Sequence, residues 1–476
     1  MGVPGTDSNF YARWREQNEA RLFLGEREGA HPPEQLLQSI WLHQRLRREQ
    51  LQTLDGQPLR VLHPGFWNRA AGPDFRGAVL QFGQEPARTG DVEIDWVCGN
   101  WQAHGHQGNP AFAGVILHVV WNGAPAGAHP LPALALEKFV DTPLGEIQRW
   151  AGTGEARDWP AELQGACSGP LAGLTPEQAG ELLQQAARVR FERKARELEA
   201  RAREAGWEQA LWEGLFRALG YKQNIWPMQR VGELLPRLQG LAGSVPAWQA
   251  RLLGVAGLLP ADIPSAGPAE YLRSLWDHWW RERESLSDVV LPRNLWRFNG
   301  LRPANQPQRR LALAAHWLSI KDFLPRLERW FTEEGTEASA AGSLLACLQA
   351  PEDDFWSWHW GLRSPRLAQP QPLLGATRVT DLAVNVILPW FWMRARAGRN
   401  EPLWKLAEAR FLAWPAAQDN ALLRLARRRM LGGSEPGGTG SAARQQGLLQ
   451  IVHDFCDHSN AVCADCHFPD LVRGFV

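Results

Sequence analysis

Segments with the pattern of β-strands are confined to the first third of the chain, and this limits the folds that it can adopt. Five such segments cover residues 59–63, 74–82, 91–97, 115–121 and 131–138. Apolar residues at helical spacing follow Pro32-Pro33-Glu34 and return from Thr175 onward. We therefore predict a mixed α+β protein, in which an α-β-β-β-α-β domain (its second α segment either a helix or a loop) precedes a larger all-α domain.

The change from strand-like to helical segments gives the domain boundaries. A polar N-terminal extension covers residues 1–30, the α/β domain covers 31–150 and the helical domain covers 170–440. Residues 441–476 contain a C-terminal helix and a Cys-rich tail, which we expect to pack back toward the N-terminal domain. A chain of 476 residues is long enough for two or three domains, each with its own core.

Charge and composition exclude several classes of protein. The 51 basic and 51 acidic residues cancel, so a nucleic acid would have to be recognised by a local patch and not by a global positive field. No run of 18 apolar residues occurs, so no membrane partner is expected. Six Cys do not make a secreted disulfide scaffold, and we expect a cytoplasmic protein. The 25 Trp are expected to fill the cores.

Three acidic residues stand at the most informative place in the α/β domain. Asp74 opens one predicted strand, and Glu93 and Asp95 lie in the next. Because side chains alternate along a strand, Glu93 and Asp95 share one face. If the turn between the strands centres near residues 84–85, Asp74 lies opposite Asp95 on that face. If the turn centres near residues 89–90, Asp74 lies too far along its strand for the three carboxylates to meet.

Two interpretations of these carboxylates are open. Three converging carboxylates repel one another unless a cation is present, and hard oxygen ligands suit Mg²⁺ or Mn²⁺. Such a cation could polarise a phosphodiester and activate water. The spacing alone nevertheless favours the simpler interpretation, in which they are solvent-facing side chains of a half-exposed hairpin.

Histidines follow the acidic hairpin closely. His104-Gly105-His106 is more typical of a loop than of a strand because of the surrounding Gly and Asn. These two imidazoles either supply further metal ligands or a general base, or they cap local turns. His118 lies in an apolar strand, where we expect a hydrogen-bonded core residue.

The C-terminal tail has metal-ligand spacing. Cys463 and Cys466 form a Cys-x2-Cys knuckle, and Cys456 precedes it by seven residues. Zn²⁺ and a [4Fe–4S] cluster both suit four thiolates. A fourth ligand would come from one of the following residues: Cys167, His453, His458 or His467. The alternative is three thiols in a terminal loop, and the isolated Cys98 and Cys347 are expected to pack in cores.

Two basic segments lie in the helical domain. Residues 188–196 place a basic stripe on one long helix, which either follows a phosphate backbone or forms a solvated face with interleaved Glu. Residues 302–310 combine three Arg with two Pro before a helix. That loop either presents ligand groups or links two helices.

The acidic motif resembles the core of the PD-(D/E)xK nuclease superfamily. The resemblance rests on Pro73-Asp74 and Glu93-x-Asp95 within the α-β-β-β-α-β order. It implies a nuclease-like fold with Asp74 and Glu93 as metal ligands. The third motif position is usually Lys, whereas this chain has Asp95 there and no Lys before Lys138. The Cys arrangement is similar to that of RecB-like nucleases with an iron–sulfur cluster, although Cys167 here follows the nuclease-like core and the spacing differs.

The chain as a whole resembles a bacterial family catalogued as domain of unknown function 2851. This family implies no established activity. The resemblance extends nearly from end to end and rests on these blocks: Ile40-Trp41, Asp55-Gly56, Asn68-x-x-Ala71-Gly72-Pro73-Asp74-Phe75, Gly90-Asp91-Val92-Glu93-Ile94, Trp101-x-x-His104-Gly105-His106, residues 115–120, Glu192-Arg193-Lys194, Leu219-Gly220-Tyr221-Lys222-x-Asn224, Arg302-Pro303-x-Asn305-x-Pro307-x-x-Arg310, Asn385 and the Cys-rich tail.

Three functions are consistent with these observations. The first is a metal-dependent nuclease-like protein, in which Asp74 and Glu93 hold Mg²⁺ or Mn²⁺, Asp95 is a third ligand, and His104 or His106 takes the proton of the water. The second is a catalytically inactive module of the same fold that binds nucleic acid or protein and has a structural metal site. The third is a metal-assisted hydrolase of a small molecule.

Overall fold

The computed structural model describes most of the chain, and the fold is mixed α+β, as predicted. The described residues are 9–18, 34–68, 72–123, 130–141, 167–221, 223–238, 243–263, 269–298, 301–333, 337–418, 421–431, 440–456 and 466–475. The chain forms two compact units. Unit 1 consists of residues 1–193, 419–439 and 444–476, and unit 2 of residues 194–418 and 440–443.

Unit 1 contains a mixed sheet whose strands follow the order β1-β3-β4-β5-β6, with the short β2 also paired to β3. Strands β1, β2 and β4 run antiparallel to β3, whereas β5 is parallel to β4 and β6 is parallel to β5. Each of the five predicted segments contains a strand, and β2 is an addition. The predicted bounds were wrong for the third segment, because β4 covers residues 88–95 and not 91–97, and for the fifth, because residues 136–138 form a 3-10 turn. The strands are β1 (Leu59–His63), β2 (Phe66–Trp67), β3 (Phe75–Phe82), β4 (Arg88–Asp95), β5 (Val115–Val120) and β6 (Ala133–Ala135).

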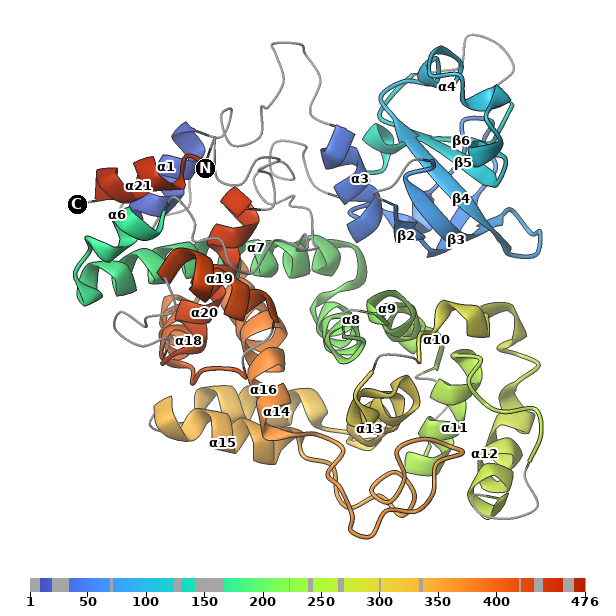
Figure 1. Ribbon diagram of the computed structural model, residues 1–476. Helices are drawn as coiled ribbons and strands as arrows, with labels where there is room; N and C mark the ends of the chain where they lie inside the picture. Colours follow the sequence, from blue (N-terminus) through green and yellow to red (C-terminus); the bar gives the residue numbers. More distant parts are fainter. Residues whose placement is uncertain are drawn as a thin grey trace. The chain divides into compact units, whose positions relative to one another are not determined.

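Helix α3 (Glu34–His43) shares a hydrophobic core with the sheet, and Figure 1 shows it beside the strands. Ile40 and Trp41 of the helix and Val92 of β4 are fully buried in this core. Burial of one such side chain stabilises a fold by about 1.5–3 kcal/mol. The indole Nε1 of Trp41 also donates to the carbonyl of Pro64 at 2.9 Å, which fixes the helix next to the end of β1.

The β3–β4 hairpin determines where the acidic residues lie. Strand β3 ends at Phe82 and β4 begins at Arg88, so the turn follows the first of the two predicted alternatives. The pairing shifts between Phe75 and Ala78, where Gly77 has φ +65°. Such a bulge is easiest with glycine because it has no Cβ. It places Asp74 beside Glu93, and the predicted pairing of Asp74 with Asp95 is therefore wrong by two residues.

The connection from β4 to the parallel strand β5 consists of short helical turns. These are α4 (Asn100–Ala103), η2 (His106–Gly108) and η3 (Pro110–Phe112). Two further turns flank the sheet, η1 (Arg48–Gln50) and η4 (Leu136–Lys138). A crossover between parallel strands starts where the first strand ends, so residues 100–112 begin next to Asp95.

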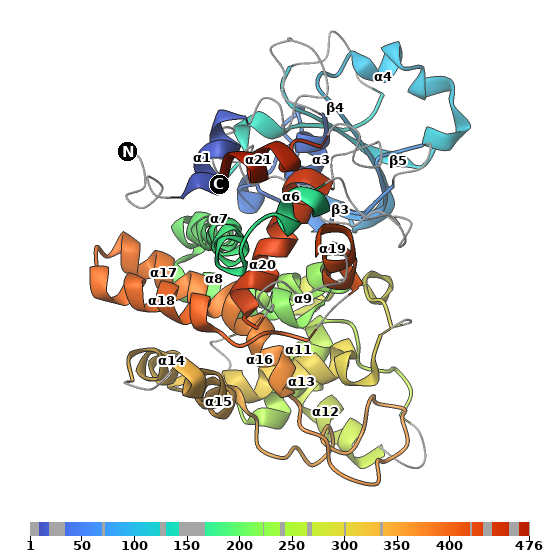
Figure 2. The ribbon, with the colours of Figure 1, turned by 60° about the vertical axis from the view of Figure 1, so that its left-hand side comes forward.

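The remaining helices of unit 1 bring together segments from both ends of the chain. Figure 2 shows α1, α6 and α21 close to one another, and their residues share one core. The Tyr11 hydroxyl donates to Asp454 at 2.7 Å, and the rings of Phe10 and Phe475 are 5.6 Å apart. The elements are α1 (Phe10–Gln17), α6 (Ser168–Ala172), the start of α7 (Pro176–Ala205), α19 (Ala421–Leu431), α20 (Ala442–Ile451), η9 (Val452–Cys456) and α21 (Phe468–Phe475).

Unit 2 is helical in its described part. Helix α8 packs on α9, α11 on α12 and α13, and α17 on α18. Its elements are the end of α7, α8 (Trp207–Leu219), α9 (Ile225–Glu233), α10 (Leu235–Leu238), α11 (Val245–Val255), α12 (Ala269–Glu282), η5 (Ser287–Val289), η6 (Arg293–Leu295), η7 (Pro303–Asn305), α13 (Pro307–Ser319), α14 (Phe323–Thr332), α15 (Glu337–Leu348), α16 (Ala376–Leu382), the π-helical η8 (Ala383–Ile387), α17 (Leu388–Ala397) and α18 (Glu401–Ala413).

Tryptophans serve as core residues in both units, as the composition predicted. Trp41 in unit 1 and Trp317, Trp356, Trp390 and Trp414 in unit 2 are among the largest fully buried side chains. Cys98 and Cys347 are buried, as expected. Among the helices in the described ranges, none combines the length and apolar character that crossing a bilayer requires.

Candidate functional site

Asp74 and Glu93 are held together by backbone hydrogen bonds at the start of β3. The backbone N–H of Asp74 donates to Oε2 of Glu93 at 3.1 Å. The backbone N–H of Ile94 donates to Oδ2 of Asp74 at 3.0 Å. Glu93 is only 8% exposed. The simpler interpretation of these carboxylates as solvent-facing groups is therefore wrong for Glu93.

Asp95 ends β4 and is 2% exposed. Its Oδ2 lies 2.9 Å from Nε2 of His118, which is on the neighbouring strand β5. His118 is fully buried. The expectation of a hydrogen-bonded core histidine is confirmed, and its partner is one of the three acidic residues.

The two histidines of the crossover lie next to these carboxylates. Nδ1 of His104 is 3.5 Å from Oδ1 of Asp95, and Nε2 of His106 is 3.4 Å from Oε1 of Glu93. Gly105 between them has φ +70°, a conformation that glycine adopts without strain. Their ring centroids are 5.4 Å apart. The pair therefore points toward the acidic strand.

Aromatic packing holds this loop in place. Trp101 of α4 is 4% exposed, and its ring centroid is 5.3 Å from that of His106 and 5.4 Å from that of His118. Phe112 also stacks on His106, with a centroid distance of 4.0 Å. The apolar contacts orient His106 while its Nε2 atom is buried without a hydrogen-bond partner among the described residues.

The donor atoms form a group that could hold a cation. One ligand atom from each of Asp95, His104 and His106 lies within 4.8 Å of the others. Glu93 lies beside this trio, next to His106. A buried imidazole nitrogen without a hydrogen bond, surrounded by carboxylates, fits a metal ligand better than a purely structural side chain. The residues present therefore fit a divalent cation.

The pKa shifts of the acidic group also favour binding of a cation. Burial and then the charge of Asp74 raise the pKa of Glu93 to about 9. Burial and then the charge of Glu34 raise the pKa of Asp74 to about 7. Burial lowers the pKa of His106, which favours its neutral, ligating form. A cation in this group would oppose the raised carboxyl pKa values, because it favours the charged forms.

Two residues of α3 belong to the site and were missed in the sequence. Gln38 Nε2 donates to Oδ1 of Asp74 at 2.8 Å and to Oε1 of Glu34 at 3.1 Å. Burial and then the charge of Asp95 raise the pKa of Glu34. Both side chains lie one turn apart on a helix that was identified only by its apolar face. A polar pair at i and i+4 beside that face was the available signal.

The Cys-rich tail is described in part. Cys167 is 6% exposed, and Cys456 and Cys466 pack against the same core, which also contains α1, α6 and α21. Cys463 lies outside the described residues, as does His458. Metal binding by these cysteines stays a prediction.

The two basic segments have structural contacts. On α7, Nε of Arg190 donates to Gln446 at 2.8 Å, and Nη1 of Arg193 is 3.0 Å from Nε2 of His453. Arg309 and Arg310 are 0% and 3% exposed. They donate to backbone carbonyls of the loop between α15 and α16, among them those of Gln371 and Leu373. Arg309 and Arg310 therefore have a structural role, and the alternative that the loop at residues 302–310 presents ligand groups stays a prediction.

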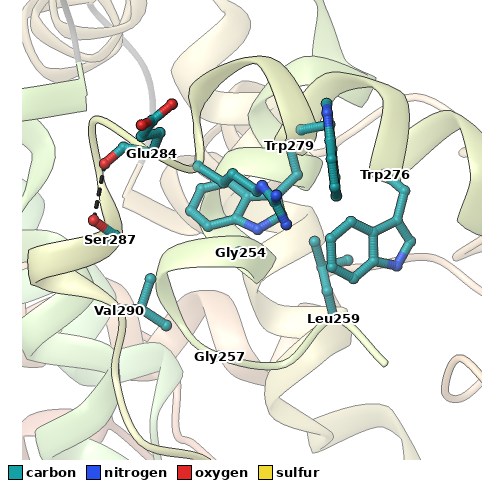
Figure 3. A pocket seen from close by; sticks show the side chains of 10 residues that line it. Gly254, Gly257, Leu259, Trp276, Trp279, Glu284, Ser287 and Val290 are labelled. Atoms are coloured by element: carbon teal, nitrogen blue, oxygen red, sulfur yellow. Dashed lines mark hydrogen bonds between the residues drawn. The ribbon is translucent and has the colours of Figure 1, made fainter. Parts of the chain in front are cut away.

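A separate hollow of about 790 Å³ lies in unit 2, between α11 and α12. Figure 3 shows Trp276 and Trp279 on its wall, beside Leu259. Trp280 is 60% exposed, and the Arg283 guanidinium lies 3.3 Å from the centre of its ring. Indole rings line this hollow, whereas Asp95, His104 and His106 converge in unit 1.

Comparisons with known proteins identify the family of this chain. A search of curated proteins finds no match, and a search of solved structures finds none either. A family model described as "Protein of unknown function (DUF2851)" matches residues 34–417. That range includes Asp74, Glu93, Asp95 and both histidines of the crossover. It covers most of the chain, and the protein therefore belongs to this family, as its sequence motifs predicted.

Proposed function

We propose that this protein is a cation-dependent, nuclease-like hydrolase that acts on nucleic acid. The observation that carries the proposal is the convergence of Glu93 and Asp95 with His104 and His106 at the end of β4. The backbone N–H of Asp74 donates a hydrogen bond to Glu93 and so holds its carboxyl group in place. The carboxylates would hold a divalent cation, for which Mg²⁺ and Mn²⁺ are the predicted candidates.

Each residue has a role in hydrolysis of a phosphodiester. A bound cation supplies Lewis-acid polarisation of the phosphoryl group and a more acidic water. His104 is half exposed at its side chain and lies beside Asp95, so it can accept the proton of the attacking water. Gln38 donates to Asp74 and keeps that carboxyl oriented. The products are a phosphomonoester and a hydroxyl group, after addition of one water.

The arrangement of elements gives secondary support. Helix α3 precedes an antiparallel β1-β3-β4 set, and a crossover leads to the parallel strand β5. Asp74 immediately precedes β3 and Glu93 lies within β4. This is the order from which the nuclease-like fold was predicted. Likeness of fold does not establish chemistry, so the proposal depends on the side chains.

The binding-only alternative rests on one specific observation. Asp95 occupies the position where the nuclease pattern has Lys, and the chain contains no Lys before Lys138. Arg cannot replace it as a base because its guanidinium stays protonated. In this alternative the same fold binds nucleic acid or protein without cleaving it.

Cleavage assays on labelled single- and double-stranded DNA and RNA, with Mn²⁺ or Mg²⁺, test the proposal. Glu93→Gln should lower the rate by at least about 100-fold. Glu85→Gln is the matched control, since Glu85 lies in the turn of the same hairpin with 47% of its side chain exposed. If no substrate is cleaved while nucleic acid still binds, the binding-only alternative replaces the proposal. If nothing is bound either, both are wrong.

A further inference from the structure

Each of two carboxylates has one oxygen engaged by a fixed donor and the other facing an imidazole. In Glu93, Oε2 accepts from the Asp74 N–H, and Oε1 faces Nε2 of His106. In Asp95, Oδ2 is hydrogen-bonded to Nε2 of His118, and Oδ1 faces Nδ1 of His104. The ligand atoms of Asp95, His104 and His106 lie within 4.8 Å of one another, and Oε1 of Glu93 lies beside His106.

The separation between the ligand atoms of Asp95 and His104 matches metal coordination, and a similar separation joins His106 to Glu93. Ligands about 2.0–2.2 Å from a tetrahedral ion are about 3.3–3.6 Å from each other. The Glu93–His106 and Asp95–His104 separations are 3.4 and 3.5 Å. These distances are too long for good N–H···O hydrogen bonds, and Nε2 of His106 is buried without such a bond among the described residues.

The donor types select among cations. Mg²⁺ prefers an octahedral set of oxygens and keeps several waters. Imidazole nitrogen instead suits borderline first-row ions, above all Zn²⁺, and carboxylate oxygen is compatible with them. A trio of Asp95, His104 and His106 provides one oxygen and two nitrogens. Three protein ligands with Glu93 alongside resemble an open site that leaves a position for water.

We infer that Asp95, His104 and His106 form a binding site for a first-row transition dication, of which Zn²⁺ is the best fit, with Glu93 at its open side. The inference rests on the proposed function in that both use the same site. It narrows the cation from the oxygen-preferring Mg²⁺ to an ion that accepts nitrogen, and it makes His104 a ligand of that ion, so that Glu93 at the open side replaces His104 as the acceptor of the water's proton. His118 is a positioning residue, because it fixes the second oxygen of Asp95.

Direct binding measurements on the full-length protein test this inference without any substrate. Zn²⁺ and Mg²⁺ are titrated by calorimetry into metal-stripped protein, and bound Zn²⁺ per chain is counted by mass spectrometry. Wild type should bind Zn²⁺ at least about 100-fold more tightly than Mg²⁺. His104→Ala and His106→Ala should each lose one Zn²⁺ equivalent or weaken its affinity at least about 10-fold.

The matched control is His278→Ala, which removes a half-buried imidazole of α12 in unit 2 and should leave Zn²⁺ binding unchanged. His104→Ala is the safer test variant, because the side chain of His104 is 51% exposed and its loss should leave the fold intact. Circular dichroism checks the fold of every variant.

Co²⁺ substitution separates this site from the Cys-rich tail. Cobalt held by nitrogen and oxygen gives ligand-field bands, whereas cobalt held by thiolates adds charge-transfer absorption. The His104 and His106 variants should lose ligand-field intensity and keep any thiolate absorption. Zn²⁺ binding that is unchanged in both variants overturns the inference, as does preference for Mg²⁺. Zn²⁺ binding that requires both histidines, in a protein that cleaves nothing, leaves the inference standing and removes the proposed hydrolase function.

Discussion

Nε2 of His118 lies 2.9 Å from Oδ2 of Asp95, and neither side chain is more than 2% exposed. The contact joins two parallel strands, β4 and β5, at the end where the crossover begins. Because a buried carboxylate without hydrogen bonds is costly, His118 makes it feasible for Asp95 to occupy this position. The same contact turns the other oxygen of Asp95 toward His104.

Replacing His118 with Leu should therefore affect both stability and cation binding. The free energy of unfolding should fall by about 1–3 kcal/mol, since the variant leaves a buried acceptor without its donor. The affinity for Zn²⁺ should fall by about 10–100-fold, because Asp95 is no longer oriented. Urea denaturation and calorimetric titration measure the two effects. His118→Gln retains a donor and should lose less stability and less Zn²⁺ affinity than His118→Leu. Equal losses in the two variants would contradict a role of His118 in orienting Asp95.

The strands could be predicted because their patterns are local. Residues 115–120 are nearly all apolar and correspond to a strand between two parallel neighbours, β4 and β6. Strand β2 contains two residues, too few to show a period. The bulge at Gly77 was missed, although a glycine inside a strand pattern is its usual signal. That omission accounts for one of the two residues by which the predicted partner of Asp74 was wrong, and the centre of the turn, at Gln84, accounts for the other.

The site was predictable only where its residues are close in the sequence. Glu93 and Asp95 alternate on one strand, and the two histidines follow within the next connection. Gln38 reaches Asp74 from a helix 36 positions earlier, and the partner of His118 depends on the pairing of β4 with β5. Contacts of this kind arise from tertiary packing, for which a single sequence contains no periodic signal.

Arg309 should be essential for the stability of unit 2. Its guanidinium donates to the carbonyls of Trp356, His359, Gln371 and Pro372, which lie in the loop between α15 and α16. Arg309→Ala leaves several of these buried acceptors without partners and should lower the free energy of unfolding by about 3 kcal/mol. Chemical denaturation measures the change.

Two controls accompany this variant. Arg309→Lys keeps the charge but not the planar fork, so it should recover only part of the loss. Arg363→Ala removes an exposed arginine of the same loop and should change the free energy of unfolding by less than about 0.5 kcal/mol. An Arg309→Ala protein as stable as the Arg363→Ala protein would show that the loop does not depend on these bonds.

Asp353 should make the stability of unit 2 depend on pH. Burial alone would raise its pKa, but hydrogen bonds from His316, from the backbone N–H groups of Trp356 and Phe355 and from Gln249 outweigh it and hold the pKa below its ordinary value. A lowered pKa in the folded state stabilises the protein above the pKa of the unfolded state. This contribution is lost as the pH falls through the lower folded pKa.

The Asp353→Asn variant tests this dependence. It should be less stable than wild type at pH 7 by about 1–3 kcal/mol, because the amide presents donors toward His316 and Gln249, which donate themselves. The difference should shrink as the pH is lowered below about 4, where the unfolded Asp begins to bind its proton. Denaturation curves between acidic and neutral pH measure it. A difference that is constant over this range would show that ionised Asp353 does not provide the stabilisation.

The Cys-rich tail should stabilise the core in which the two ends of the chain meet. Cys167, Cys456 and Cys466 all contact that core. If they hold a metal centre together with Cys463, removing the metal should lower the melting temperature of unit 1, because a ligand that binds only the folded state stabilises it. Cys466→Ser should have the same effect without chelator.

Absorption spectra and metal analysis of anaerobically purified protein distinguish the two candidate centres. Brown colour with sulfur-to-iron charge transfer identifies a [4Fe–4S] cluster, and a colourless protein with thiol-dependent zinc identifies Zn²⁺. A Cys466→Ser protein with unchanged metal content and melting temperature would leave these cysteines as ordinary core residues.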